Sequence, residues 1–220
     1  MSNSGLVNYT NISPNKTSPR NATIDTITIH CMAGDCSVET CGAIFEKPSR
    51  NASSNYGVGS DGRIGMYVEE KDRSWCSSSA SNDHRAITIE VANDGDASTG
   101  WHIGEKAMDS LVKLCADICV RNGMNNLIWK ADRTLVGKAD KQNMTLHRWF
   151  SDTDCPGDYI VSQMSQIASR VNNIIKSPHA VAALSSSSVS TYNYIDANVT
   201  SAQELVDVSK IHPYLATISE

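Results

Sequence analysis

Residues 86–92, Ala-Ile-Thr-Ile-Glu-Val-Ala, predict the clearest β-strand of the chain. Successive side chains of a strand point to opposite faces, so one face of this strand is aliphatic and the other is polar. Glu90 lies on the polar face. Residues 24–30, Ile-Asp-Thr-Ile-Thr-Ile-His, alternate in the same way and end on His30, which is also on the polar face. If the two strands share a sheet, the side chains of His30 and Glu90 can lie on the same face of it.

The rest of the chain alternates further strands with helices. Two short strands on either side of the Asp61-Gly62 turn predict a hairpin, and Leu127-Ile-Trp129 predicts another short strand. Apolar residues recur at helical spacing in three segments, which predict amphipathic helices at 37–45, 104–121 and 158–176. This order of elements predicts the α/β class, with a single mixed β-sheet flanked by helices and a C-terminal appendage.

Composition divides the chain of 220 residues into four parts. Residues 1–22 are polar and predict an N-terminal surface segment, and residues 23–178 contain all the predicted core and form the catalytic domain. Residues 179–191 are rich in Ser and predict a linker. Residues 192–220 are too few to build a core alone, so they pack on the main domain, mediate homo-oligomerisation or begin a second module.

The totals exclude several classes of protein. A net charge of −5 provides no attraction to nucleic acid, and no apolar stretch is long enough for insertion in a membrane. The N-terminus lacks the basic and then apolar build of a signal peptide, so we expect synthesis in the cytoplasm. Seven cysteines are an odd number, which fits free thiols better than a disulfide framework.

A candidate metal site follows from two residues near the end of the predicted domain. His147 and Cys155 stand in Thr-Leu-His-Arg-Trp-Phe-Ser-Asp-Thr-Asp-Cys-Pro-Gly, residues 145–157. Together with His30 they would offer two imidazoles and one thiolate, which can hold a zinc ion and leave its fourth position open for catalysis. Taken singly, each residue also has an ordinary structural role, such as a hydrogen-bonded histidine at the rim of the core or a buried thiol.

Four segments of the chain together resemble a known family. They are Thr28-Ile-His30, Asn55-Tyr-Gly-Val-Gly-Ser-Asp-Gly62, Ile87-Thr-Ile-Glu-Val91 and the stretch from His147 to Cys155-Pro-Gly157. In this order they resemble the zinc-dependent N-acetylmuramoyl-L-alanine amidases, whose amidase-2 fold is shared by phage endolysins and peptidoglycan recognition proteins. The resemblance covers residues 24–175.

The resemblance implies the roles of individual residues. The zinc ligands would be His30, His147 and Cys155. Tyr56 would help to place the attacking water, Thr153 would donate toward the scissile carbonyl oxygen, and Glu90 would be a general base. The implied reaction is hydrolysis of the amide between N-acetylmuramic acid and L-alanine in bacterial peptidoglycan by zinc-activated water, with lysis of the cell wall as the result. The resemblance thus implies an antimicrobial action like that of a bacteriophage endolysin, while a bacterial autolysin stays an alternative origin.

The segment after the hairpin departs from the family pattern. Many relatives carry His after the tryptophan that corresponds to Trp75, whereas this chain has Trp75-Cys76. Trp75, Asn82 and His84 are therefore only loose candidates for substrate binding. An ordinary surface loop is the alternative interpretation of these residues.

Three other functions stay open at this point. They are a non-catalytic peptidoglycan-binding module on the same fold, a cysteine peptidase, and an unrelated α/β protein whose candidate ligands never meet. The peptidase is disfavoured because no Cys in a Gly-rich, nucleophile-like setting precedes His147.

Overall fold

A computed structural model describes residues 2–177 and residue 181. Apart from residue 181, the predicted linker at 179–191 and the predicted appendage at 192–220 lie outside the described residues. The predicted roles of that tail, including homo-oligomerisation, therefore stay predictions.

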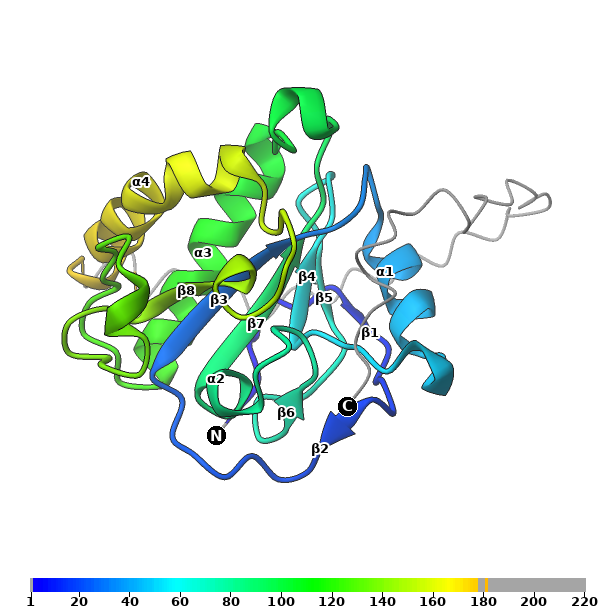
Figure 1. Ribbon diagram of the computed structural model, residues 1–220, viewed down its shortest axis with the longest axis horizontal. Helices are drawn as coiled ribbons and strands as arrows, with labels where there is room; N and C mark the ends of the chain where they lie inside the picture. The colour runs from blue at the N-terminus through cyan, green and yellow to red at the C-terminus, as the bar shows by residue number, and fades with distance from the viewer. Residues whose placement is uncertain (1, 178–180, 182–220) are drawn as a thin grey trace.

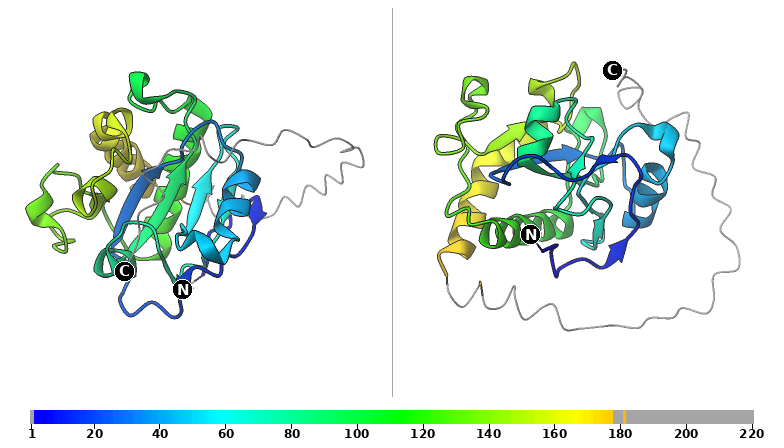
Figure 2. Two further views of the ribbon diagram at one scale, coloured as in Figure 1. Left: turned by 45° about the vertical axis from the view of Figure 1, so that its right-hand side comes forward. Right: turned by 90° about the horizontal axis from the view of Figure 1, so that it is seen from below.

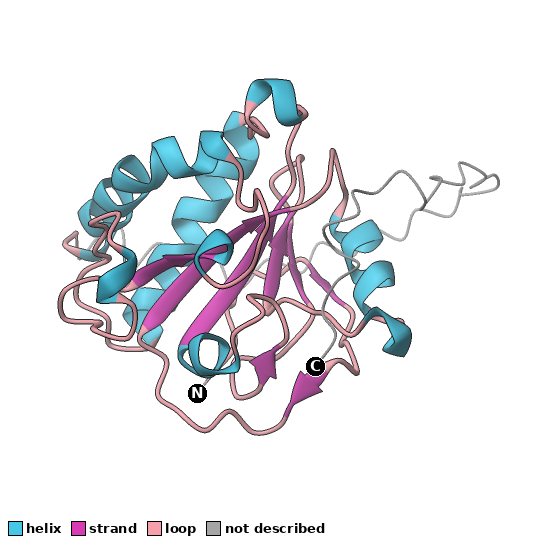
Figure 3. Ribbon diagram, viewed as in Figure 1, coloured by secondary structure: helices cyan, strands magenta, loops and turns pink. Residues whose placement is uncertain are grey.

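The described chain folds around a six-stranded mixed sheet, with the spatial order β1-β5-β4-β7-β3-β8 (Figures 1 and 3). Its strands are β1 (Tyr9–Thr10), β3 (Thr26–Cys31), β4 (Tyr56–Val58), β5 (Ile64–Met66), β7 (Ala86–Val91) and β8 (Met144–Leu146). The pair β4–β5 is the predicted hairpin and is antiparallel, whereas the other neighbours in this sheet run parallel. The predicted α/β class with a single mixed sheet is confirmed.

Two long helices cover the aliphatic face of the sheet. They are α3 (Glu105–Arg121) and α4 (Asp158–Ile175), which contact each other and agree closely with the predicted helices (Figure 2). Their apolar sides meet the isoleucines and valines of β3 and β7 in one continuous core. The fully buried members of this core include Ile27, Ile29, Ile87, Ile89, Leu111, Leu114, Ile118 and Ile160. Burial of this aliphatic surface is the main favourable term in forming the domain.

The opposite face of the sheet is covered by smaller elements. Helix α1 (Val38–Phe45) begins at the predicted N-cap Ser37, whose hydroxyl accepts from the backbone N–H of Thr40, and packs on β1, β4 and β5. Helix α2 (Ala80–Arg85) precedes β7 directly and packs on β6 (Arg73–Ser74) and β7. On this face of the sheet, Glu90 of β7 borders a cavity.

The N-terminal segment is part of the domain, which corrects the prediction of a surface segment at residues 1–22. Strand β1 forms the edge of the main sheet, and β2 (Lys16–Thr17) pairs with β6 (Arg73–Ser74) in a second, two-stranded sheet. Arg20 is buried, and its guanidinium donates to backbone carbonyl groups, among them those of Glu70 and Asp72. Backbone pairing integrates this polar stretch, which an analysis of hydrophobic periodicity does not detect.

The predicted strand at residues 127–129 is wrong. The N–H of Leu127 donates to Asn172 Oδ1 at 2.7 Å, and the N–H of Ile128 donates to Asn143 Oδ1 at 2.6 Å. Side chains therefore take the hydrogen bonds that a neighbouring strand would otherwise make. In the described part of the chain, no helix combines the length and the apolar character needed to cross a membrane.

Candidate metal centre and active site

His30 lies on the polar face of the sheet because of its place in β3. Ile27 and Ile29 point into the core beneath α3 and α4, so His30 points to the other face, where it is 1% exposed. On the neighbouring parallel strand β7, Glu90 stands directly opposite His30. The predicted placement of these two side chains on one face of one sheet is therefore correct.

Strand β8 positions His147 next to His30. This short strand runs parallel to the other edge of β3, and the 3-10 turn His147–Trp149 begins where it ends. The carboxyl ends of parallel strands lie at the same edge of a sheet, which brings the ring of His147 next to that of His30. Their ring centroids are 4.9 Å apart.

Cys155 completes a group of three metal donors. It lies in the loop between this turn and α4, and the backbone N–H of Arg148 donates to its carbonyl oxygen at 3.1 Å. Its Sγ is 3.5 Å from His30 Nδ1. Each of the residues His30, His147 and Cys155 offers one donor atom, and these three atoms lie within 4.8 Å of one another. Three candidate ligands from distant parts of the chain thus converge.

The electrostatics of the histidines suit a metal site. Burial, together with the neighbouring His147, lowers the pKa of His30 well below its usual value, and burial lowers the pKa of His147 to about 4. Both rings are therefore neutral at pH 7 and can offer a lone pair to a cation. Ser78 Oγ is 3.3 Å from His147 Nε2, so Nδ1 is the ring nitrogen that makes no hydrogen bond within the described part of the chain.

The thiol of Cys155 needs a cation to ionise. Burial and contact with the thiol of Cys31 raise the pKa of Cys155 well above its usual value. A bound divalent cation reverses this preference, because a coordinating thiol is deprotonated outright. The buried Nε2 of His30 has no hydrogen-bond partner among the described residues, so a strongly polar group still lacks a neighbour at this site.

The spacing of the donors fits a zinc-sized ion. Zinc binds a thiolate at about 2.3 Å and an imidazole at about 2.0–2.1 Å, and at a tetrahedral angle these two ligands lie about 3.6 Å apart. The observed separation between Cys155 Sγ and His30 Nδ1 is 3.5 Å. With three protein ligands, a fourth position would stay open toward the cavity.

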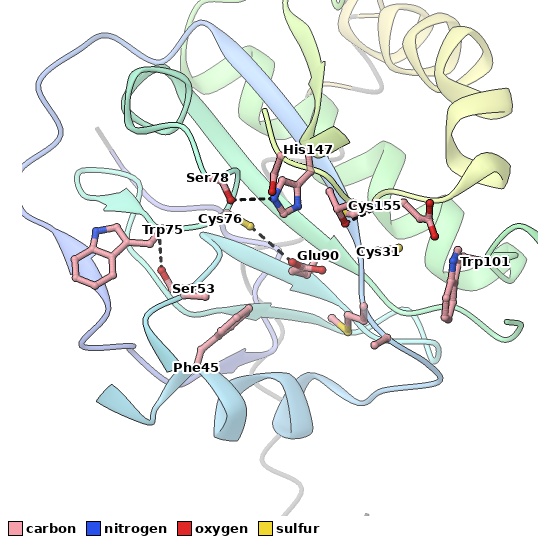
Figure 4. Close-up of a pocket in the computed structure, with 16 residues that line it drawn as sticks. Cys31, Phe45, Ser53, Trp75, Cys76, Ser78, Glu90, Trp101, His147 and Cys155 are labelled. Atoms are coloured by element: carbon pink, nitrogen blue, oxygen red, sulfur yellow. Dashed lines mark hydrogen bonds between the residues drawn. The ribbon is translucent and has the colours of Figure 1, made fainter. Parts of the chain in front are cut away.

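Glu90 borders the cavity beside the donor group (Figure 4). It is 7% exposed, and burial raises the pKa of its carboxyl to about 8 against smaller opposing effects of Cys76 and Arg50. The Cys76 thiol donates to Glu90 Oε1 at 3.7 Å. A carboxyl group with a pKa near neutrality can both accept and return a proton.

Thr153 also borders the cavity, two residues before Cys155. Its Oγ1 accepts from the backbone N–H of Cys155 at 3.2 Å. Because that contact uses a lone pair of the oxygen, the hydroxyl proton remains available to a group in the cavity.

Tyr56 does not reach the cavity, which corrects the role that the resemblance implied for it. In the register of β4 and β7, Tyr56 stands opposite Ile89 and therefore faces the helices. Its side chain is 0% exposed. Its hydroxyl donates to Glu70 Oε1 at 2.7 Å and accepts from the backbone N–H of Ser4 at 2.9 Å. Tyr56 therefore fixes the N-terminal segment to the core.

The three substrate-binding candidates separate in the structure. Trp75 borders the cavity, and its Nε1 donates to Thr17 Oγ1 at 2.9 Å. Asn82 is buried beneath the site, and its amide donates to Thr28 Oγ1 at 3.0 Å. His84 is not among the residues lining the cavity, and its Nδ1 accepts from the backbone N–H of Asn21 at 3.0 Å. The structure leaves Trp75 as a candidate and gives Asn82 and His84 structural contacts instead.

Several residues at the site had no assigned role in the sequence. Ser78 contacts His147, while Phe45 and Trp101 provide aromatic walls of the cavity. Buried Asp83 holds the loop before α2, because its carboxylate accepts from the backbone N–H groups of Cys76 and Ser77, each at 3.0 Å. The sequence contains one indication of this loop. Ser77, Ser78 and Ser79 precede a short helix that contains Asp83, and such a pattern is typical of a loop fixed by side chains.

Comparisons with known proteins agree with this geometry. The family model described as N-acetylmuramoyl-L-alanine amidase matches residues 20–158. A comparison with curated protein sequences finds no match.

Solved structures show a similar fold. A mutant endolysin from Bacillus subtilis is 16% identical, with a TM-score of 0.55 over 76% of this chain and 99% of that chain. The Staphylococcus aureus hydrolase AmiA in complex with its ligand is 18% identical, with a TM-score of 0.54 over 74% of this chain and 80% of that chain. The catalytic domain of XlyA is 17% identical, with a TM-score of 0.50 over 74% and 97%. The family match spans more than half of the sequence, and this chain belongs to the N-acetylmuramoyl-L-alanine amidase family.

Proposed function

We propose that this protein is a zinc-dependent peptidoglycan hydrolase that cleaves the amide between N-acetylmuramic acid and the L-alanine of the stem peptide. The observation that carries the proposal is the convergence of His30, His147 and Cys155, of which His147 and Cys155 border the cavity. Family membership supplies the reaction. The donor set supplies the means, because two neutral imidazoles and a thiolate are ligands that a catalytic zinc takes in proteins.

The zinc ion would supply two effects when bound: it polarises the scissile carbonyl group and lowers the pKa of a water molecule to about 7. The chain's own residues supply the rest. His30 and His147 are held in place by β3 and β8, so the donor geometry is set by the sheet before any ion arrives. Ser78 Oγ, beside His147 Nε2, would hold that ring in place and leave Nδ1 for the ion.

Glu90 would carry the proton. Its carboxylate borders the same cavity from the adjacent strand, and it would take a proton from the attacking water and return it to the leaving amine of L-alanine. Burial alone raises the pKa of this carboxyl to about 8, and a nearby cation would favour the ionised form, which is the form that accepts the proton.

Thr153 would stabilise the developing negative charge. Its hydroxyl proton is not needed for the contact with the Cys155 N–H, so it can be donated to the carbonyl oxygen of the substrate. One such donor is typically worth about 3–4 kcal/mol in the transition state. Phe45, Trp75 and Trp101 would form the apolar walls against which the substrate packs.

The alternative is a module on the same fold that binds peptidoglycan without cleaving it. A full set of ligands together with Glu90 in the cavity favours the enzyme over that alternative. The partner would be bacterial peptidoglycan, and the likeness to an endolysin supports a lytic role on the cell wall, of the kind that bacteriophage enzymes have.

The test is mass spectrometry of peptidoglycan digested by the purified protein, combined with elemental analysis of the protein. We expect free glycan strands, stem peptides that begin with alanine, and about one zinc per chain. Cys155→Ser should lose the ion and the products, while Cys36→Ser, which removes a half-buried thiol outside the donor group, should keep both. Binding to cell walls without these products would support the non-catalytic module instead.

A further inference from the structure

A second group of metal donors adjoins the proposed zinc ligands. One donor atom each from His30, Cys76 and Glu90 lie within 4.8 Å of one another, and all three residues are buried. In Figure 4 the Cys76 thiol is directed at the carboxyl group of Glu90 inside the cavity. The reaction proposed above uses Glu90 and His30 but gives Cys76 no part.

The pair formed by Cys76 and Glu90 already has the spacing of two ligands of one ion. A thiolate at about 2.3 Å and a carboxylate oxygen at about 2.0–2.2 Å from a tetrahedral zinc lie about 3.6 Å apart. Cys76 Sγ and Glu90 Oε1 are 3.7 Å apart. Both side chains sit on fixed backbone, because the N–H of Cys76 donates to buried Asp83 and Glu90 lies within β7.

His30 offers the third donor atom of this group. Nδ1 lies beside Cys155 Sγ, whereas Nε2 is buried and has no hydrogen-bond partner among the described residues. Buried polar atoms without partners are rare in native proteins, and each one calls for an explanation such as an ion. One imidazole can face two ions, one at each nitrogen.

We propose that His30, Cys76 and Glu90 form a second, weaker site for a divalent ion of the zinc group, and that its occupancy inhibits the hydrolase. An imidazole, a thiolate and a carboxylate in one buried cluster suit Zn²⁺ or Cd²⁺ better than a hard cation such as Mg²⁺. Binding displaces the thiol proton of Cys76, the Nε2 proton of His30 and the carboxyl proton of Glu90 into solvent. The site is the weaker of the two because it shares His30 and lies next to another cation.

The expected consequence follows from Glu90. A carboxylate that binds an ion no longer accepts the proton of the attacking water, so excess metal should slow turnover. Binding of the second ion depends only on the three donors, whereas inhibition rests on the proposed function.

The test is a titration of metal-free protein with Cd²⁺, in which bound metal is measured by equilibrium dialysis and elemental analysis. Thiolate-to-metal charge-transfer absorption counts the sulfur ligands independently. Wild-type protein should bind two ions through two thiolates, while Cys76→Ala and the nearly isosteric Cys76→Ser should each bind one. Cys36→Ser, the matched control, should still bind two ions, and thermal unfolding shows whether each variant is folded.

The outcomes separate the two proposals. Saturation of the wild type at one ion, or two ions in both Cys76 variants, would overturn the second site and leave the proposed function intact. No tightly bound ion at all would overturn the proposed function. If the second site exists, excess Zn²⁺ should inhibit the wild type, and that inhibition should be lost in Cys76→Ser.

Discussion

Replacing Glu90 by Gln should stabilise the metal-free protein at alkaline pH, because the native fold buries a carboxyl group that resists ionisation. Burial raises the pKa of Glu90 from 4.5 to about 8. Between these two values the unfolded chain loses the proton while the folded chain keeps it. The stability that neutral Glu90 contributes is therefore fully present below pH 4.5 and is lost as the pH rises through 8.

The size of the effect follows from these two values. Relative to its value when Glu90 is protonated in both states, the free energy of unfolding falls by about 0.8 kcal/mol at pH 5 and by about 4.7 kcal/mol at pH 9. The glutamine side chain of the variant resembles the neutral form of Glu90 and does not titrate. The difference in unfolding free energy between Glu90→Gln and the wild type should therefore grow by about 4 kcal/mol from pH 5 to pH 9, in favour of the variant.

The assay is urea denaturation at both pH values, followed by circular dichroism, with chelator and reductant present. Metal must be removed because a nearby cation favours the ionised carboxylate. The matched control is Glu46→Gln, which removes an exposed carboxylate just after α1 and should show no such growth. If the difference for Glu90→Gln were the same at pH 5 and pH 9, the argument that burial holds this carboxyl neutral would be refuted.

Three further predictions concern single side chains. With zinc bound, Glu90→Gln should keep the ion but lower kcat by roughly 10²–10⁴, the usual worth of acid–base catalysis, and normal turnover across pH would remove Glu90 from the mechanism. Cys155→Ser should abolish cleavage and weaken metal binding while far-ultraviolet circular dichroism stays native, because the sheet forms without the ion; unchanged lysis would show that Cys155 is no ligand. Tyr56→Phe should leave kcat unchanged and cost about 1–3 kcal/mol in urea denaturation, because Glu70 and the Ser4 N–H lose a buried partner. A large fall in kcat without a loss of stability would restore a catalytic role for Tyr56.

Local pattern was sufficient for much of the fold. Strict alternation in residues 24–30 and 86–92 separates an aliphatic face from a polar face, and this separation alone predicts that His30 and Glu90 lie on the same side if the strands pair. Helical periodicity placed α3 and α4 within a residue or two. The motif around His147 and Cys155 identified candidate ligands because residue type and chemistry are themselves local properties.

The sequence by itself thus determined which face of each strand is polar and which side chains can bind a metal. Only the tertiary structure decided which of them meet. Parallel pairing of β8 with β3 brings His147 to His30 across more than a hundred residues, and the register of β4 against β7 turns Tyr56 away from the cavity. The same holds for Asn82, whose buried contact with Thr28 comes from another element. Strand order and register depend on hydrogen bonds between distant segments, and a shift of one residue reverses the face of every side chain, so no local pattern fixes them.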